Sequence, residues 1–344
     1  MNEFNHPLYA GPYRFVGSFP TGCLVDSWKA VKKDSEGFYV VRSYPKSVFD
    51  DLNSRQSISN ECYLRQKLRH QYISSFVEVI QEGDYSHLVT KGPSGISLTE
   101  YLLKNGPLDY EKTMLSIARI IWVFQYLIDD FEIFNCELNS DNIFMDFQGE
   151  IELVFFSFEE QKMTPNSISN MCYKPPEFFS ATKTGLSAYS WTIGVLAYQM
   201  CMGKLPFTGR NDDEIEYKIL KTHPEDFAEI NQVLRNLILK CLIKNPLMRM
   251  TFGDIKSNDM FILLEPSLNE RKARRLSEFD EKTCSIAGSN SYSGNTPIKT
   301  RPRGNTVSEK NKVYDIAPSV RITSKKLYGR PRYPAGSPPP NNIK

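Results

Sequence analysis

The chain has 344 residues, of which 40% are hydrophobic, and this is enough to bury either one large domain or two smaller lobes. No apolar run reaches the roughly eighteen residues of a membrane span, and the N-terminus lacks a basic region followed by an apolar stretch, which favours a cytoplasmic location, with a nuclear one as the alternative. The seven cysteines are scattered singly, without a CxxC pair or a histidine cluster, which argues against a structural zinc site.

Short runs rich in β-branched and aromatic residues come first along the chain and predict strands. One helix is predicted among them, over residues 60–70 (NECYLRQKLRH). The predicted strands cover residues 13–19, 23–31, 37–44, 76–80 and 87–90.

After Gly95 the apolar residues recur at helical spacing, first over residues 114–124 and later over 230–242. Between these stretches, residues 142–146 and 151–156 predict two short strands around a turn at 148–149. The order of patterns predicts an α+β fold in which a small β-rich lobe precedes a larger helical lobe.

Several motifs follow one another in a specific order on this layout. They are a loop at 135–142 (NCELNSDN), the segment YKPPE at 173–177, a long apolar helix with a GxxPF turn at 189–207, and Arg249. This arrangement resembles the eukaryotic protein kinase fold, most nearly its calmodulin-dependent-kinase-like Ser/Thr branch. The resemblance implies a kinase-like domain at 13–262, with lobes at 13–91 and 96–262.

The resemblance places a nucleotide site in the first lobe. Gly17 and Gly22 match two glycines of the loop whose backbone presses onto phosphates, whereas Phe19 replaces the middle glycine, and a plain hairpin turn is the alternative interpretation. Arg42 stands where the family carries the phosphate-holding lysine. It keeps the positive charge but presents a wide planar fork.

Glu61 matches the helix glutamate that pairs with that lysine, so a pair with Arg42 is expected, and a solvated helix-surface glutamate is the alternative. Arg65 lies where such kinases place an apolar residue that locks the active arrangement.

The loop at 135–142 aligns with the family pattern HRDLKPEN. Glu137 replaces the aspartate base, Asn139 replaces the lysine that neutralises the transferring phosphate, and the metal-binding Asn142 is retained. A base displaced by about 1 Å can lose roughly a hundredfold in rate when catalysis depends on positioning. The loop therefore predicts impaired chemistry.

Thirteen residues beyond Asn142, Phe155 takes the place of the aspartate that is the principal magnesium ligand. A phenylalanine ring offers no oxygen to a hard cation, so magnesium binding is not expected. One rescue is available, in which Glu159 or Glu160 reaches back to the metal position.

The architectural half of the family signature is better kept. Glu177 and Arg249 match a buried ion pair that holds the activation segment, and only the aspartate before Trp191 is replaced, by Tyr189. The resemblance therefore implies a pseudokinase, a scaffold or allosteric regulator in phosphorylation signalling that requires no cofactor and binds ATP weakly at most. A slow Ser/Thr kinase that uses Glu137 as its base is the alternative, and no residue favours a different reaction. The implied partners are proteins, among them an active kinase or its substrates.

Residues 267–344 are rich in Ser, Pro and basic residues and predict a disordered tail. Two arginines just before Ser277 match the preference of a basophilic kinase, so Ser277 is a candidate phosphorylation site, with a solvated linker as the alternative. The positive charge of the tail suits an acidic partner.

Overall fold

The computed structural model describes residues 8–19, 26–133, 138–154, 171–180, 185–225, 227, 229–258 and 261. All of them belong to the first of two compact units, Met1–Ile298. Predictions for Gly22, Glu137, Phe155, Glu159, Glu160, Ser277 and the tail lie outside the described residues.

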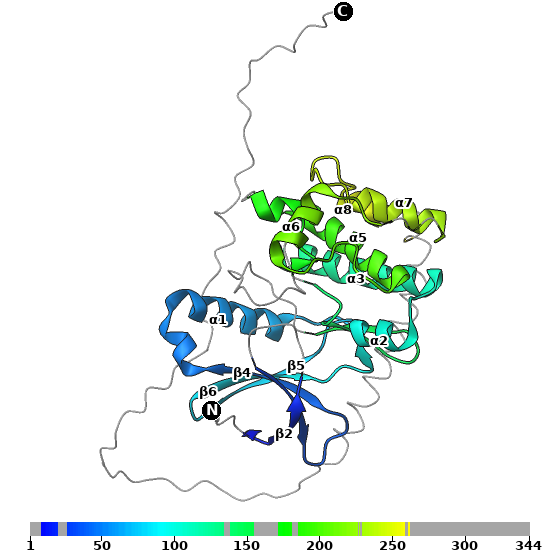
Figure 1. The fold of residues 1–344 in the computed structure, drawn as a ribbon. Coiled ribbons are helices and arrows are strands. Elements are labelled where there is room, and N and C mark those ends of the chain that lie inside the picture. Colours follow the sequence, from blue (N-terminus) through cyan, green and yellow to red (C-terminus); the bar gives the residue numbers. More distant parts are fainter. Residues whose placement is uncertain are drawn as a thin grey trace, which may run out of the picture. The chain divides into compact units, whose positions relative to one another are not determined.

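The N-terminal lobe is built on a six-stranded antiparallel sheet with the strand order β1-β2-β3-β4-β6-β5, and four of its strands, β2, β4, β5 and β6, are labelled in Figure 1. All five strands predicted for this lobe are confirmed, and the two-residue β1 was not predicted. The strands are β1 (Tyr9–Ala10), β2 (Tyr13–Ser18), β3 (Ser27–Lys32), β4 (Tyr39–Pro45), β5 (Phe76–Glu82) and β6 (Tyr85–Lys91).

Alternate residues of these strands face opposite sides of the sheet, as the period of two requires. Val40 and Leu88 lie on one side, here called the inner face, in a buried cluster with Ile58 and Cys62 of helix α1 (Leu52–Lys67). Val41 and Val89 lie on the other side, the outer face, and pack in a separate cluster with residues of β1–β3. The lobe therefore has two apolar layers.

Helix α1 begins at Leu52, well before the predicted start at Asn60, and it ends at Lys67 and not at His70. The boundary prediction was wrong because residues 52–59 are mostly polar and carry no clear apolar stripe. A short 3-10 helix, η1 (Lys46–Asp50), leads into it.

A second sheet of three strands joins the two lobes and consists of β7 (Ile96–Ser97), β8 (Ile143–Met145) and β9 (Ile151–Leu153). The prediction of β8 and β9 around a turn is confirmed, and Gly149 has the positive φ of 79° that this turn requires. This sheet positions the loop at 138–142, because Val154, directly after β9, donates its backbone N–H to the carbonyl of Asn142.

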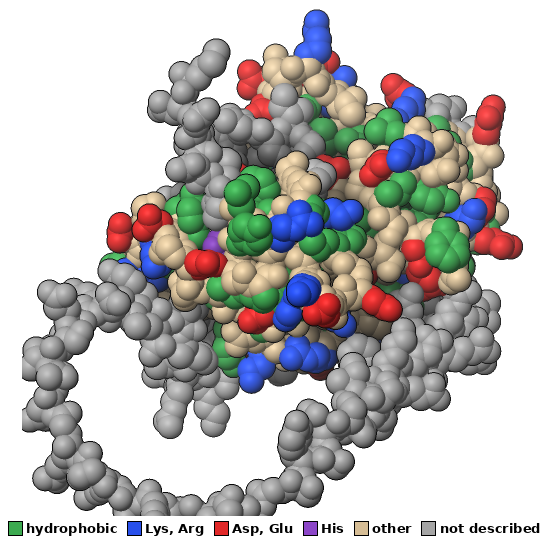
Figure 2. Space-filling model, turned by 90° about the horizontal axis from the view of Figure 1, so that it is seen from below, with side chains coloured by type: hydrophobic (Ala, Val, Ile, Leu, Met, Phe, Trp, Pro, Cys, Tyr) green, Lys and Arg blue, Asp and Glu red, His purple; other side chains and the backbone are tan. Residues whose placement is uncertain are grey.

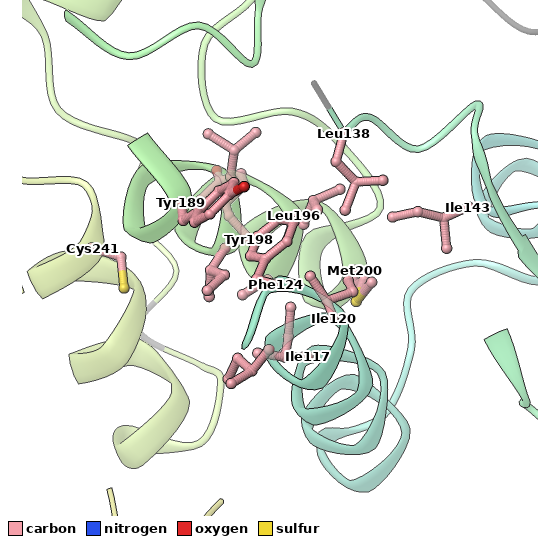
Figure 3. Close-up of a cluster of buried hydrophobic side chains, with 14 of the residues drawn as sticks. Ile117, Ile120, Phe124, Leu138, Ile143, Tyr189, Leu196, Tyr198, Met200 and Cys241 are labelled. Atoms are coloured by element: carbon pink, nitrogen blue, oxygen red, sulfur yellow. The ribbon is translucent and has the colours of Figure 1, made fainter. Parts of the chain in front are cut away.

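The C-terminal lobe is helical (Figure 1), and buried side chains of α3, α5 and α7 form its core (Figure 3). Helix α5 is buried on nearly all sides from Ala188 to Met200, which explains why its sequence is apolar without a stripe. The helices are α2 (Leu98–Asn105), α3 (Tyr110–Phe131), α5 (Leu186–Met202), α6 (Asp212–Lys221), α7 (Gln232–Cys241) and α8 (Phe252–Lys256), with the 3-10 helix η2 (Pro176–Ser180).

Polar caps set the beginnings of these helices. Asp109 accepts a hydrogen bond from the backbone N–H of Lys112 at the start of α3, and Asn231 caps α7 in the same manner. Thr251 and Asp254 form a reciprocal capping box at α8. No helix among the described residues combines the length and apolar character that crossing a membrane requires.

Candidate functional site

An ion pair links the inner face of the N-terminal sheet to helix α1. Arg42 of β4 places Nη1 2.7 Å from Oε1 of Glu61 and donates a second hydrogen bond, 3.1 Å long, to the hydroxyl of Tyr44. Both members of the pair are buried, so the interpretation of Glu61 as a solvated surface residue is wrong.

Glu61 also accepts a hydrogen bond from a second arginine. Arg65, one helical turn further on, places Nε 2.9 Å from the same Oε1 atom, and Tyr44 donates its hydroxyl to Oε2 at 3.3 Å. Burial alone would raise the pKa of Glu61, but the guanidinium groups of Arg42 and Arg65 outweigh it and hold the pKa below the ordinary value. The position that is apolar in the family is thus occupied by a buried cation.

The two asparagines of the loop at 138–142 are hydrogen-bonded to the loop's own backbone. Oδ1 of Asn139 accepts from the N–H groups of Asp141 and Asn142, at 2.9 and 3.1 Å. Oδ1 of Asn142 accepts from the N–H of Asn139 at 3.0 Å. Both side chains are buried. The positions that the family uses for a cation and a metal ligand therefore close the turn here.

A buried cluster of hydrogen-bonded hydroxyl and amide groups, which was not predicted from the sequence, holds Ser140 of this loop. The hydroxyl of Tyr173 donates to Oε1 of Gln199 at 2.6 Å, and Nε2 of Gln199 donates to Oγ of Ser140 at 3.0 Å. Ser140 lies 2.8 Å from the Tyr173 hydroxyl and 2.6 Å from that of Thr99. Burial raises the pKa of Tyr173, so the cluster is neutral. The isolated polar Gln199 in the apolar sequence of α5 was the signal for it.

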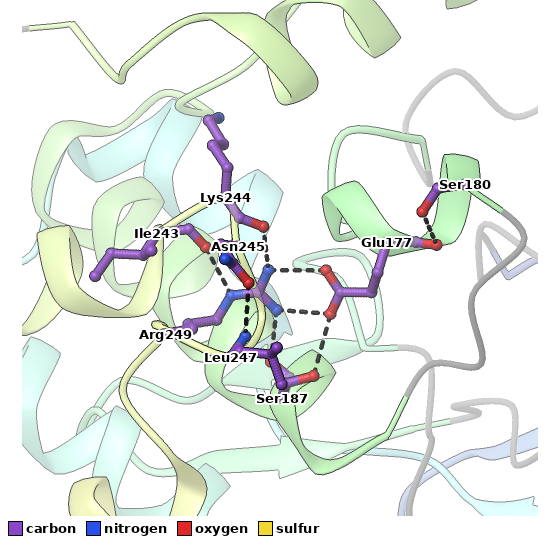
Figure 4. Close-up of polar contacts among 8 residues, drawn as sticks. All are labelled: Glu177, Ser180, Ser187, Ile243, Lys244, Asn245, Leu247 and Arg249. Atoms are coloured by element: carbon purple, nitrogen blue, oxygen red, sulfur yellow. Dashed lines mark hydrogen bonds and ion pairs between the residues drawn. The ribbon is translucent and has the colours of Figure 1, made fainter. Parts of the chain in front are cut away.

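Glu177 and Arg249 form a bidentate ion pair in the C-terminal lobe (Figure 4). Nη1 and Nη2 of Arg249 lie 2.7 and 2.8 Å from the two carboxylate oxygens. The guanidinium also donates to the carbonyls of Ser187, Ile243 and Lys244. Each of its three nitrogen atoms therefore has a hydrogen-bond acceptor inside the protein.

Tyr189 keeps a structural link at the position where the family has an aspartate. Its hydroxyl donates to the carbonyl of Ile133 at 3.1 Å, and its ring stacks on Phe124 with centroids 4.1 Å apart. The Tyr189 hydroxyl therefore holds the backbone at Ile133, just before the loop.

In the glycine-rich segment, Gly17 lies on β2 opposite Lys29, with open space where a Cβ would be. Phe19 is 8% exposed, and its ring stacks on Phe144 of β8 with centroids 5.3 Å apart. An aromatic side chain thus occupies the space between the two sheets.

Of the two magnesium ligands that the family uses, the described residues include the position of one, Asn142, and the position of the other, Phe155, lies outside them. Within residues 8–19, 26–133, 138–154 and the described segments of the second lobe, no three His, Cys, Asp or Glu side chains are grouped as a metal site would require. Oδ1 of Asn142 already accepts a backbone hydrogen bond, and the residue after Val154 is a phenylalanine, whose ring has no oxygen ligand.

Comparison with known proteins agrees with the fold. The family model described as "Protein kinase domain" matches residues 16–261. Serine/threonine-protein kinase SIK2 of Gallus gallus is 23% identical over 228 residues, and serine/threonine-protein kinase SIK1 of Mus musculus is 24% identical over 213 residues. The matches cover 65% and 60% of this chain but only 28% and 27% of those relatives, so the chain spans little more than a quarter of their length.

Proposed function

Because the chain belongs to the protein kinase family, we propose that it is a pseudokinase, which keeps the family fold and acts by binding other proteins without transferring phosphate. The observation that carries the proposal is the closed hydrogen bonding of Asn139 and Asn142, whose side-chain oxygens serve the backbone of the loop. Phosphoryl transfer depends on positioned cations around the phosphate. Here one cation position is an amide, and the metal-binding amide oxygen already uses one of its two lone pairs on a backbone N–H.

The charges of the N-terminal lobe support the same proposal. Arg42 carries the positive charge of the missing lysine, but its guanidinium is hydrogen-bonded to Glu61 and Tyr44. Oε1 of Glu61 contacts both Arg42 and Arg65. A guanidinium fork held in this manner cannot take the compact single-point contact of a lysine ammonium without breaking buried hydrogen bonds.

The intact parts of the fold support a binding role. The Glu177–Arg249 pair and the Ser140–Tyr173–Gln199 cluster hold the second lobe together without using a catalytic group. We therefore propose a scaffold or allosteric regulator whose partners are an active kinase or its substrates, in the cytoplasm.

The test is a thermal-unfolding series with ATP, with and without magnesium. A working Mg-ATP site filled at a hundred times its Kd would add about 2.7 kcal/mol. At roughly 2–4 °C per kcal/mol for a domain of this size, that is a Tm increase of about 5–10 °C. We expect a weak response to ATP and no further increase with magnesium. A large increase that requires magnesium would contradict the proposal.

A slow Ser/Thr kinase with Glu137 as its base is the competing function. It predicts transfer of radiolabelled phosphate from ATP that is lost in Glu137→Ala. We expect no transfer by either protein, and transfer that persists in Glu137→Ala would indicate a contaminating kinase.

A further inference from the structure

We propose that Phe19 is a built-in plug whose ring fills the place of a purine base, so that the cleft between the two sheets is closed to nucleotides in the absence of a partner. This inference deepens the proposed function and rests on it, because it names what keeps the degenerate site empty.

The ring of Phe19 is enclosed by side chains from both lobes. It stacks on Phe144 with an interplanar angle of 15° and lies 6.2 Å from the ring of Phe38. Val40 of β4 and Val154, just after β9, belong to the same buried cluster. A flat ring between aliphatic groups on one side and an aromatic ring on the other has the environment that a purine base would need.

A β-bulge directs Phe19 inward. Tyr13 and Phe15 face the outer side of the sheet, and strict alternation would place residues 17 and 19 there as well. The register between β2 and β3 shifts at Val16, so Gly17 pairs with Lys29, whose neighbour on β4 is the inward-facing Val40. The extra residue reverses the faces of the sheet to which the following side chains point, so that residues 17 and 19 face inward.

The backbone then fixes this orientation. The N–H of Phe19 donates to the carbonyl of Ser27 at 2.7 Å, which continues the hairpin ladder by one more residue. Ser27 in turn pairs with Arg42, so the ring lies on the same face of the sheet as the cation of the site.

The position of the cluster in the sequence identifies it as the base end of the site. Val40 precedes Arg42 by two residues and lies on the same face of β4. Phe144 lies on β8, two residues after Asn142. Arg42 and Asn142 mark the phosphate end that the fold family implies. The apolar space next to both is therefore where a base would stack, and Phe19 and a base cannot occupy it together.

The experiment compares two phenylalanine truncations on the same segment. Phe19→Ala opens the space between the sheets, and the matched control Phe15→Ala removes a ring that stacks on Trp28 on the outer face. The probe is adenosine without metal, measured by titration calorimetry. If the plugged form is populated above about 90%, removing the plug tightens binding roughly tenfold or more. We expect this gain in Phe19→Ala and none in Phe15→Ala.

One outcome would overturn the plug, namely equal adenosine affinity in the unmodified chain and in a folded Phe19→Ala. If Phe19→Ala does not fold, Phe19→Leu keeps most of the apolar volume and removes the flat ring, and it must show a smaller gain in the same direction. Phosphoryl transfer by the unmodified chain would refute the proposed function separately, because the adenosine titration uses neither phosphate nor metal.

Discussion

At the scale of single residues, the molecule separates charges that hold the fold from charges that would do chemistry. Glu177 and Arg249 are enclosed and fully hydrogen-bonded, whereas the positions for a phosphate-binding cation and a metal ligand carry asparagines turned toward their own backbone. Buried ion pairs add little net stability when formed, but removing one partner leaves an uncompensated buried charge. The pairs are therefore sensitive reporters of the fold.

We expect Glu177→Gln to lower the free energy of unfolding by about 3–5 kcal/mol, because the buried guanidinium of Arg249 loses its counter-charge. Urea unfolding measures the change. The matched control is Glu100→Gln, which removes the exposed pair with Lys104 and should cost less than about 1 kcal/mol. Equal effects of the two variants would contradict the assigned structural role.

Glu61 should make stability depend on pH. Its folded pKa lies below the ordinary value of about 4.3, so its stabilising effect is present above that pH and disappears as the pH falls through the folded value. We expect Glu61→Gln to have a lower free energy of unfolding than the unmodified chain at pH 7. The difference between the two free energies should become smaller below about pH 4. Urea unfolding at pH 7, 5, 4 and 3 measures it, and a gap that stays constant to pH 3 would rule out this linkage.

At the scale of elements, close contact between α5 and α7 sets the geometry of the second lobe. A Cβ on Gly194 of α5 would lie 2.7 Å from Cβ of Cys241 and 2.9 Å from Cδ2 of Leu242. The Cys241 atom is attached to the backbone of α7 and cannot rotate away, so a larger residue must separate the helices. The position requires glycine because of its neighbour and not because of its own backbone.

Two effects oppose each other in Gly194→Ala. Alanine favours the helix by about 1 kcal/mol, but overpacking costs roughly 1–3 kcal/mol, and the rigid contact lets the second effect win. We expect a net loss of about 1–2 kcal/mol in urea unfolding. In Gly253→Ala, where the nearest atom to the new Cβ is 3.7 Å away, the same change should be neutral or stabilising. A stabilised Gly194→Ala would show that the helices separate without penalty.

At the scale of the whole molecule, charge is divided unevenly along the chain. Residues 270–344 contain 16 Lys and Arg against 6 Asp and Glu, a net charge of +10, and the remaining residues contain 42 − 16 = 26 basic and 40 − 6 = 34 acidic residues, a net charge of −8. On the described surface shown in Figure 2, positive and negative side chains are interspersed. The proposal of an acidic partner therefore concerns the tail.

We expect the full chain to bind heparin, used as a polyanion probe, at low salt and to release it as salt rises, because the Debye length shrinks to about 3 Å at 1 M. A chain ending at residue 266 should pass through a heparin column without retention. Equal retention of both chains would place the polyanion-binding charge in the folded part.

The sequence by itself determined the kinase fold, because motif order is a property of residue type, and the residue at position 155, a phenylalanine without an oxygen ligand, is the sequence basis of the proposed loss of activity. Only the tertiary structure decided how the remaining groups are used. Ser140 meets Tyr173 through a contact between residues 33 positions apart, which no local pattern encodes. The inward turn of Phe19 depends on a one-residue shift in strand pairing at Val16, and pairing register arises between strands. The start of α1 at Leu52 was also missed, because the first turns of this helix are mostly polar and show no apolar repeat that would predict a helix.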